Sequence, residues 1–129
     1  MLDRRETMGG AIALGLLGSI GVRANVTGNS MYGLIGKIKA APGKRSELIS
    51  ILAEGTGAMP GNLAYIVAED LADEHGIWIM EVWSDKEAHA ASLKLPAVQQ
   101  AIAKGRPLIA GFEDRHELRP IGIAGLVAQ

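Results

Sequence analysis

One of the three histidines in this sequence is placed where it could act as a general base. His89 follows the apolar segment "GIWIMEVW" by six residues and lies in a stretch with helical spacing. An imidazole has an unperturbed pKa of about 6.5, so it can accept a proton near neutral pH. We predict His89 as the catalytic base, and the alternative of an exposed helix residue stays open. His75 is expected to be solvated in a turn, and His116 to make a structural hydrogen bond in a strand.

Four side chains are predicted to bind a substrate beside this base: Tyr65, Trp78, Trp83 and Ser92. The aromatic rings can stack on a planar ligand, and the Tyr65 and Ser92 hydroxyls can bond its oxygens. Core packing is the alternative for the rings, and a bond to the helix backbone is the alternative for Ser92. Glu81 shares a strand face with Trp83, where we expect a partly buried, paired structural carboxylate.

Other chemistries lack the residues that they need. The sequence has no cysteine, which excludes disulfides, thiolate metal sites and thiol nucleophiles. The histidines show no HxH, HxxxH or HExxH spacing, so no metal site is predicted. Thirteen Lys and Arg against fourteen Asp and Glu, with no basic run, favour no nucleic-acid partner.

The N-terminal segment differs in composition from the rest of the chain. Arg4 and Arg5 precede an uncharged stretch over residues 8–22, a pattern that resembles a twin-arginine export signal. The stretch is shorter than the roughly 20 residues of a membrane span, so no stable span is expected in the mature protein. Residues 1–24 are predicted to be a signal peptide, and the protein to be periplasmic or exported.

The remaining boundaries follow from composition. Residues 25–30 are predicted to be a linker, residues 31–122 a folded domain and residues 123–129 a C-terminal tail. An alternative start at Met31 would remove the signal and leave the protein cytoplasmic.

Hydrophobic periodicity predicts the elements that must position these side chains. Alternation, partial in the first case, predicts strands over 32–40 and 112–119, and apolar runs bounded by turn residues predict strands over 62–70 and 77–83. Helical spacing predicts helices over 44–55, 85–94 and 96–105. Ser84 and Glu87 form a capping-box pattern at the start of the second helix, and Gly105 is the predicted C-cap of the third. In the last strand, alternation places Arg115 on the same face as Glu117 and on the other face from Phe112. The order is that of a split β-α-β-β-α-β, ferredoxin-like α+β fold with a four-stranded antiparallel sheet.

The strand over 77–83 is apolar on both sides. Ile77, Ile79 and Trp83 share one side, and Trp78, Met80 and Val82 share the other. Such a strand needs cover on both faces. Helices can cover one face, so a second copy of the chain is expected to cover the other, as a homodimer.

Four motifs together resemble one known family. They are "APGKRSEL", "MPGNLAYIVAED", "WIMEVWSDKEAHAASLKLPAVQ" and "GRPLIAGFEDRHELRPIG", and the likeness extends over residues 31–122. The chain is similar to the antibiotic biosynthesis monooxygenases, especially their small bacterial quinol monooxygenase branch. The resemblance implies a dimeric α+β barrel with a cavity between sheet and helices. It also implies oxidation of phenols, quinols or anthrone-like polyketides without metal, flavin or haem, so we expect no cofactor.

Haem-degrading relatives of this family have a distinct set of residues. Their Asn, Trp and His positions correspond by eye to Gly36, Ser92 and Ala103, none of which matches. Haem oxygenation is therefore not expected.

The expected function is a cofactor-independent monooxygenase that oxidises a small quinol or other electron-rich aromatic with dioxygen. A deprotonated quinol can itself pass an electron to dioxygen, so the protein must bind it, deprotonate it and exclude water. Two alternatives stay open. The chain can be a non-catalytic dimeric module for hydrophobic ligands or stress responses, or an isomerase or lyase acting on a lactone.

Overall fold

The computed structural model describes residues 30–54 and 58–123. The predicted signal peptide, nearly all of the linker and residues 124–129 of the predicted tail lie outside the described residues. Within the described part, no helix is long and apolar enough to cross a membrane.

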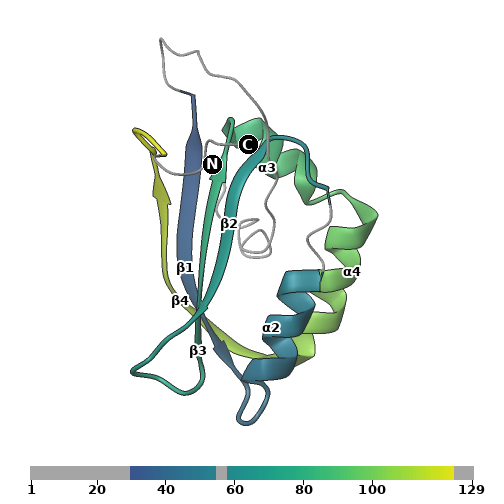
Figure 1. Cartoon of the computed structure of the whole chain (residues 1–129). Helices are drawn as coiled ribbons and strands as arrows, with labels where there is room; N and C mark the ends of the chain where they lie inside the picture. Colours follow the sequence, from purple (N-terminus) through teal and green to yellow (C-terminus); the bar gives the residue numbers. More distant parts are fainter. Residues whose placement is uncertain (1–29, 55–57, 124–129) are drawn as a thin grey trace.

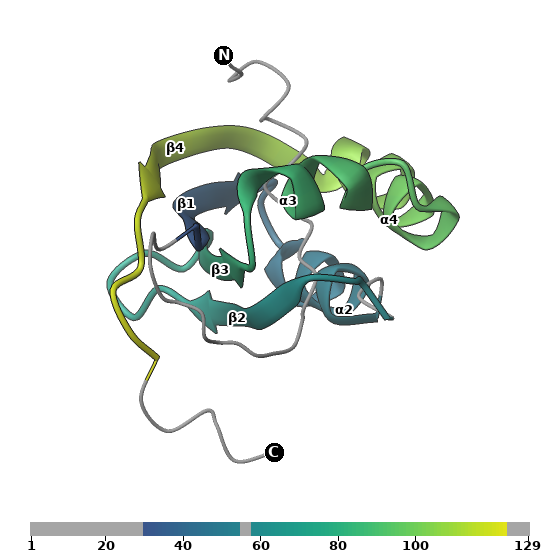
Figure 2. The same ribbon diagram turned by 90° about the horizontal axis from the view of Figure 1, so that it is seen from above.

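Four strands form one antiparallel sheet in the order β2-β3-β1-β4. The elements in chain order are β1 (Tyr32–Ala40), α2 (Arg45–Glu54), β2 (Asn62–Glu69), β3 (Gly76–Trp83), α3 (Lys86–Ser92), α4 (Pro96–Gly105), the short 3-10 helix η2 (Arg106–Leu108) and β4 (Ile109–Leu118). Seen from above, β2 and β4 lie at the sheet edges with β1 and β3 between them (Figure 2). The predicted ferredoxin-like α+β fold is confirmed.

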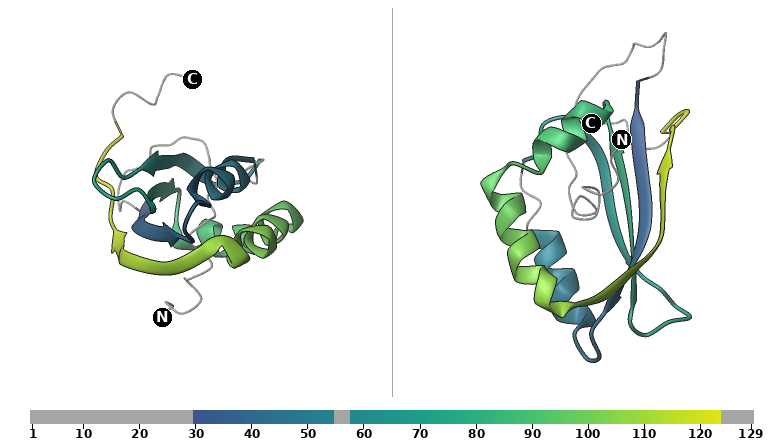
Figure 3. Two further views of the ribbon diagram at one scale, coloured as in Figure 1. Left: turned by 90° about the horizontal axis from the view of Figure 1, so that it is seen from below. Right: turned by 180° about the vertical axis from the view of Figure 1, so that it is seen from behind.

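The helices lie on one face of this sheet (Figure 1, Figure 3). Helices α2 and α4 pack side by side, and Leu48 and Leu52 of α2 are fully buried against the sheet. One core cluster comprises Ile38, Ala40, Leu48, Leu52, Ile77 and Ile79, and a second comprises Tyr32, Leu34, Met59, Trp83 and Val98. Burial of these side chains supplies the main driving force for folding.

Two predicted caps are wrong. The N-cap of α3 is Asp85, whose Oδ1 accepts a hydrogen bond from the backbone N–H of Ala88 at 2.7 Å. Asp is as good an N-cap as Ser, and it lies one residue closer to the helix. Gly105 is the last residue of α4 with a right-handed φ of −79°. Its small size matters instead, because an added Cβ would lie 3.1 Å from Leu48 Cδ1.

A β-bulge in β4 overturns the predicted alternation of the last strand. Lys37 pairs with Glu113 and Ile35 with His116, so two residues, Asp114 and Arg115, stand opposite Gly36 alone. Asp114 has φ of +46°, a left-handed conformation that Asp tolerates better than most residues. A shift of one residue moves every later side chain to the other face. Arg115 therefore shares the helix-covered face with Phe112.

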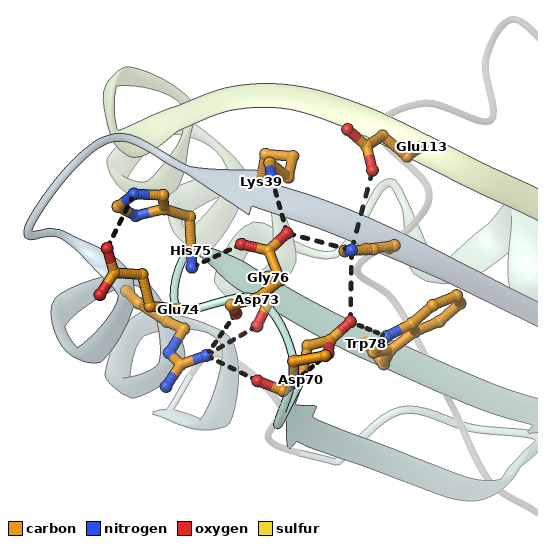
Figure 4. Close-up of polar contacts among 11 residues, drawn as sticks. Lys39, Asp70, Asp73, Glu74, His75, Gly76, Trp78 and Glu113 are labelled. Carbon is orange, nitrogen blue, oxygen red and sulfur yellow. Dashed lines mark hydrogen bonds and ion pairs between the residues drawn. The ribbon is translucent and has the colours of Figure 1, made fainter.

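The β2–β3 turn is held by charged side chains (Figure 4). Lys39 Nζ lies 2.6 Å from Asp73 Oδ2, and Trp78 Nε1 donates to Asp70 Oδ2 at 2.8 Å. Arg45, the first residue of α2, connects this helix to the turn. Its Nη1 donates to the carbonyl oxygens of Asp70, Asp73 and Gly76 at 3.0–3.2 Å.

We expect Arg45→Met to destabilise the protein by about 1 to 3 kcal/mol, because the turn carbonyls lose a charged donor. The matched control is Lys44→Met, which removes the same charge from a side chain that is half exposed and pairs only with Glu47. Its expected cost is below about 0.5 kcal/mol. Urea unfolding of both variants checks this, and equal costs would contradict the role of Arg45.

Candidate functional site

A pocket lies on the helix-covered face, over β1, β3 and β4. Its apolar wall is formed by Leu34, Ile38, Ile79 and Phe112. The charged residues in its lining are Lys37, Glu81, Glu113 and Arg115. The enclosed volume is about 30 Å³, and the hollow measures about 390 Å³ when its part open to solvent is counted. The enclosed part holds about two water molecules. A ring-sized ligand must therefore lie partly in the mouth.

Glu81 is the buried acid of this pocket. It is 1% exposed, on the central strand β3, and its Oε1 accepts a hydrogen bond from Trp83 Nε1 at 3.0 Å. Burial raises the pKa of Glu81 well above its usual value, and the Trp83 bond and the Arg115 charge offset this only in part. The carboxyl is thus more deeply buried than predicted, and its burial favours the protonated form.

His89 lies next to this carboxyl. It is 5% exposed, so the alternative of an exposed helix residue is wrong. Its Nε2 lies 3.8 Å from Glu81 Oε1, and its ring contacts the rings of Trp83 and Tyr32 at centroid distances of 5.3 and 5.6 Å. His89 and Glu81 therefore form a buried pair of titratable groups.

Helix α3, which carries His89, depends on a glycine for its position. Gly61 has φ of +89°, and a Cβ at this residue would lie 2.5 Å from the Ala88 Cβ. Only glycine accepts both the left-handed backbone and this close approach. The "MPGN" segment thus brings the start of β2 against α3.

Tyr65 contributes a third buried polar group. It stands directly opposite Glu81 in the β2–β3 register, and its hydroxyl is buried without a hydrogen-bond partner among the described residues. Burial raises the pKa of Tyr65 well above its usual value, and the nearby Glu81 carboxylate raises it further. An unpaired buried hydroxyl is costly and is rare outside functional sites.

The other predicted binders lie in different places. Trp83 is fully buried, and it orients Glu81 through its indole N–H. Ser92 is buried, but its Oγ donates to the His89 carbonyl oxygen at 2.6 Å, which is the alternative left open for it. Trp78 lies on the opposite face with Asp70, so the structure does not bring it to the other four residues. The pocket lining includes Glu81 but none of the three histidines and none of the four predicted binders.

Two contributors are not apparent in the sequence. Arg115 reaches the pocket only because of the bulge in β4, and its Nε and Nη2 are buried without a partner among the described residues. Tyr32 contacts His89 and donates from its hydroxyl to Glu117 Oε2 at 2.5 Å. A non-glycine residue that tolerates a left-handed φ, such as Asp114, is the one sequence signal for the bulge, and it is weak.

The arrangement suits proton transfer to or from a small ligand in a largely apolar pocket. A coupled pair, Glu81 and His89, can take up a proton, and the Tyr65 and Arg115 donors can bond an oxygen. No group of three or more His, Asp or Glu among residues 30–54 and 58–123 is placed to hold a metal ion.

The fold is that of a ferredoxin-like α+β protein, and the pocket lies on the face of its sheet that the helices cover. The model of the antibiotic biosynthesis monooxygenase family matches residues 31–104. The chain belongs to this family, as its sequence motifs predicted. A comparison with curated proteins gives no match.

Solved structures agree with this assignment. A candidate antibiotic biosynthesis monooxygenase from Chloroflexus aurantiacus is 58% identical, with a TM-score of 0.74, and the match covers 75% of this chain and 99% of that one. A similar candidate from Caulobacter crescentus is 19% identical, with a TM-score of 0.67 and coverage of 73% and 92%. SnoaB, a cofactor-independent oxygenase from Streptomyces nogalater, is 14% identical, with a TM-score of 0.63 and coverage of 74% and 98%. The last two show the fold alone.

Proposed function

We propose that this protein is a cofactor-independent monooxygenase that oxidises a small quinol or other electron-rich aromatic with dioxygen. The observation that carries the proposal is the buried Glu81–His89 pair beside a pocket with an apolar wall, in a chain of this family. SnoaB, which shares the fold, is itself a cofactor-independent oxygenase.

The pair supplies the step that such a reaction needs from a protein. Proton transfer from the substrate O–H to the pair leaves an anion that gives one electron to dioxygen. The substrate radical and superoxide then combine to form a C–O bond, and the peroxide takes a proton back from the pair. Loss of the proton on the peroxide-bearing carbon then breaks the O–O bond, so that one oxygen atom stays in the product as a carbonyl and the other leaves with this proton and the peroxide proton as water. The pocket wall excludes bulk water from these intermediates.

Dioxygen uptake by the full-length, chelator-treated protein tests the proposal. The substrates are naphthohydroquinones and benzohydroquinones, with a no-enzyme control for autoxidation. We expect uptake above autoxidation that falls about 10²- to 10⁴-fold in His89→Ala, the usual contribution of acid–base catalysis. Uptake no faster than autoxidation for the whole panel would reject the oxygenase and favour the non-catalytic binding module.

We further propose a homodimer through the open face of the sheet. Ile66 and Met80 are direct neighbours across β2 and β3 on this face, and they are 51% and 40% exposed. Leu118 of β4 adds a third exposed apolar side chain. Apolar side chains grouped on one sheet face are typical of an interface.

We expect Met80→Arg to convert the dimer to a monomer, because a charge at the centre of an apolar interface loses its hydration. Sedimentation velocity gives the mass of each variant. Leu71→Arg is the control, because Leu71 is fully exposed in the β2–β3 turn and its substitution is expected to leave the mass unchanged. A monomeric wild-type protein, or a Met80→Arg dimer, would contradict the interface.

A further inference from the structure

The pocket contains a cation with an unused binding edge. Arg115 Nε and Nη2 are both buried and have no hydrogen-bond partner among the described residues. These two nitrogens form one side of the guanidinium group, where two N–H bonds run parallel. Such an edge matches the two oxygens of a carboxylate. A buried donor pair without an acceptor costs free energy unless a ligand supplies the acceptor.

The nearest carboxylates of the chain are already engaged. Glu117 accepts from the Tyr32 hydroxyl and lies 3.4 Å from Lys86 Nζ. Glu81 accepts from Trp83, and burial raises its pKa, which favours its neutral form. In the described part of the chain, neither of them forms an ion pair with Arg115. Glu113, the third carboxylate of the pocket, pairs with Lys37, and the Tyr32 hydroxyl lies close to the Arg115 guanidinium. Neither Nε nor Nη2 has a hydrogen-bond partner among the described residues, so the edge is available to an acceptor from outside the chain.

The backbone of β4 is shaped to present this edge. The bulge at Asp114 turns Arg115 towards the helix-covered face, opposite Gly36 of β1. A Cβ at Gly36 would lie 3.7 Å from the Arg115 Cα, Cβ and Cγ atoms, in ordinary van der Waals contact, so Arg115 packs directly over Gly36. Bulges recur next to binding sites, where they redirect one side chain.

The pocket's dimensions and wall indicate the rest of the ligand. Strand β1 lies between β4 and β3, so Arg115 and Glu81 stand on strands about 10 Å apart. The apolar wall of the pocket consists of Leu34, Ile38, Ile79 and the half-exposed Phe112. Because the enclosed part of the pocket holds only about two water molecules, an aromatic ring in this span lies partly in the mouth.

We propose that the pocket binds an aromatic carboxylic acid as its carboxylate, with the two carboxylate oxygens on Nε and Nη2 of Arg115 and the ring over Gly36 against the apolar wall. This inference rests on the proposed function for the claim that such an acid is the substrate. The binding itself is independent of turnover. In the oxidation, the substrate is then an electron-rich aromatic that carries a carboxylate.

Calorimetric titration of the full-length protein with 2-naphthoate and with 2-naphthamide tests the inference at neutral pH. The two probes have nearly the same shape and differ in charge. We expect 2-naphthoate to bind at least tenfold more tightly than 2-naphthamide. Equal affinities, or no binding of 2-naphthoate, would overturn the inference.

Three variants assign the preference to Arg115. In Arg115→Gln we expect the affinity for 2-naphthoate to fall at least tenfold and that for 2-naphthamide to stay within about threefold. Arg115→Lys keeps the charge but lacks the two parallel N–H donors of the guanidinium, and we expect an intermediate loss of affinity for 2-naphthoate. Arg119→Gln removes an equal charge from an exposed residue next to β4 and is expected to change neither affinity. An equal loss of affinity in Arg119→Gln would show that 2-naphthoate binding depends only on the net charge of the protein, and this would overturn the inference. If Arg115→Gln does not fold, Arg115→Lys and the wild-type comparison decide.

Oxidation assays separate this inference from the proposed function. The substrates are a naphthohydroquinone carboxylate and the corresponding carboxamide. Tight 2-naphthoate binding without oxidation of either hydroquinone would reject the oxygenase and keep the anion site. Equal oxidation of both hydroquinones, with no preference for 2-naphthoate, would keep the oxygenase and reject the anion site.

Discussion

Glu81→Gln is expected to lower the rate of substrate oxidation by about 10²- to 10⁴-fold while the protein stays folded. The amide keeps an oxygen that can accept the Trp83 N–H, but it cannot exchange a proton with the neighbouring His89. The measurement is kcat for dioxygen uptake at several pH values. Glu47→Gln is the control, because Glu47 lies on α2, is more than half exposed and does not line the pocket. A kcat for Glu81→Gln within about threefold of wild type would reject Glu81 as a member of the proton-transfer pair.

The same substitution is expected to stabilise the protein above acidic pH. Burial raises the pKa of Glu81, so the folded state holds this proton at pH values where the unfolded chain has lost it. The contribution of Glu81 to the stability of the wild-type protein is complete below the pKa of Glu81 in the unfolded chain, near 4.5. It is lost as pH rises towards the pKa of Glu81 in the folded protein. The groups facing Glu81 are Tyr65, His89 and Arg115, and all three stay in place in the variant.

Urea unfolding at a series of pH values measures this effect. We expect the free energy of unfolding of Glu81→Gln relative to wild type to rise by at most about 1.4 kcal/mol per pH unit above the unfolded pKa. A difference that stays constant with pH would show that Glu81 ionises freely in the folded protein. A gain in stability with a loss of activity is the usual signature of a functional buried group.

Trp83→Ala is expected to have the largest effect on stability, a loss of about 3 to 5 kcal/mol. Trp83 is fully buried in the second core cluster, and its indole also contacts His89 and donates to Glu81. The free energy of unfolding in urea is the measurement. Small domains have only about 5 to 15 kcal/mol of stability, so the variant is expected to be close to its folding limit.

Trp78→Ala is the matched control for this prediction. Trp78 has the same side chain on the same strand, but it is partly exposed on the open face, where it bonds Asp70. Its expected cost is about 1 to 2 kcal/mol. Equal costs for the two variants would contradict the assignment of Trp83 to the central core.

Most of the fold could be predicted from the sequence, because the local signals agree with one another. Alternation in "YGLIGKIKA" and "GIWIMEVW", helical spacing of Leu48 and Leu52, and the Pro-Gly turns all indicate the same order of elements. The errors fell where two nearby residues could serve equally well, as with Ser84 and Asp85 at the start of α3.

The site could be predicted only in part. His89, Tyr65 and Trp83 were found because their side-chain chemistry is rare in this chain, and the structure brings all three around Glu81. Arg115 was missed because strand alternation assumes unbroken pairing, and the bulge at Asp114 reverses the face of the residues that follow. The burial of Glu81 was underestimated because it depends on the packing of α3 against β3, which no local pattern encodes.

Oxidation of a naphthohydroquinone under ¹⁸O-labelled dioxygen tests the central claim most directly. The reaction contains the full-length, chelator-treated protein and is quenched early, and the mass of the product is measured by mass spectrometry. A monooxygenase with no bound cofactor predicts one ¹⁸O atom in each product molecule and one in water, with the yield lost in Glu81→Gln. A product without ¹⁸O, with all the label in hydrogen peroxide, would contradict the account.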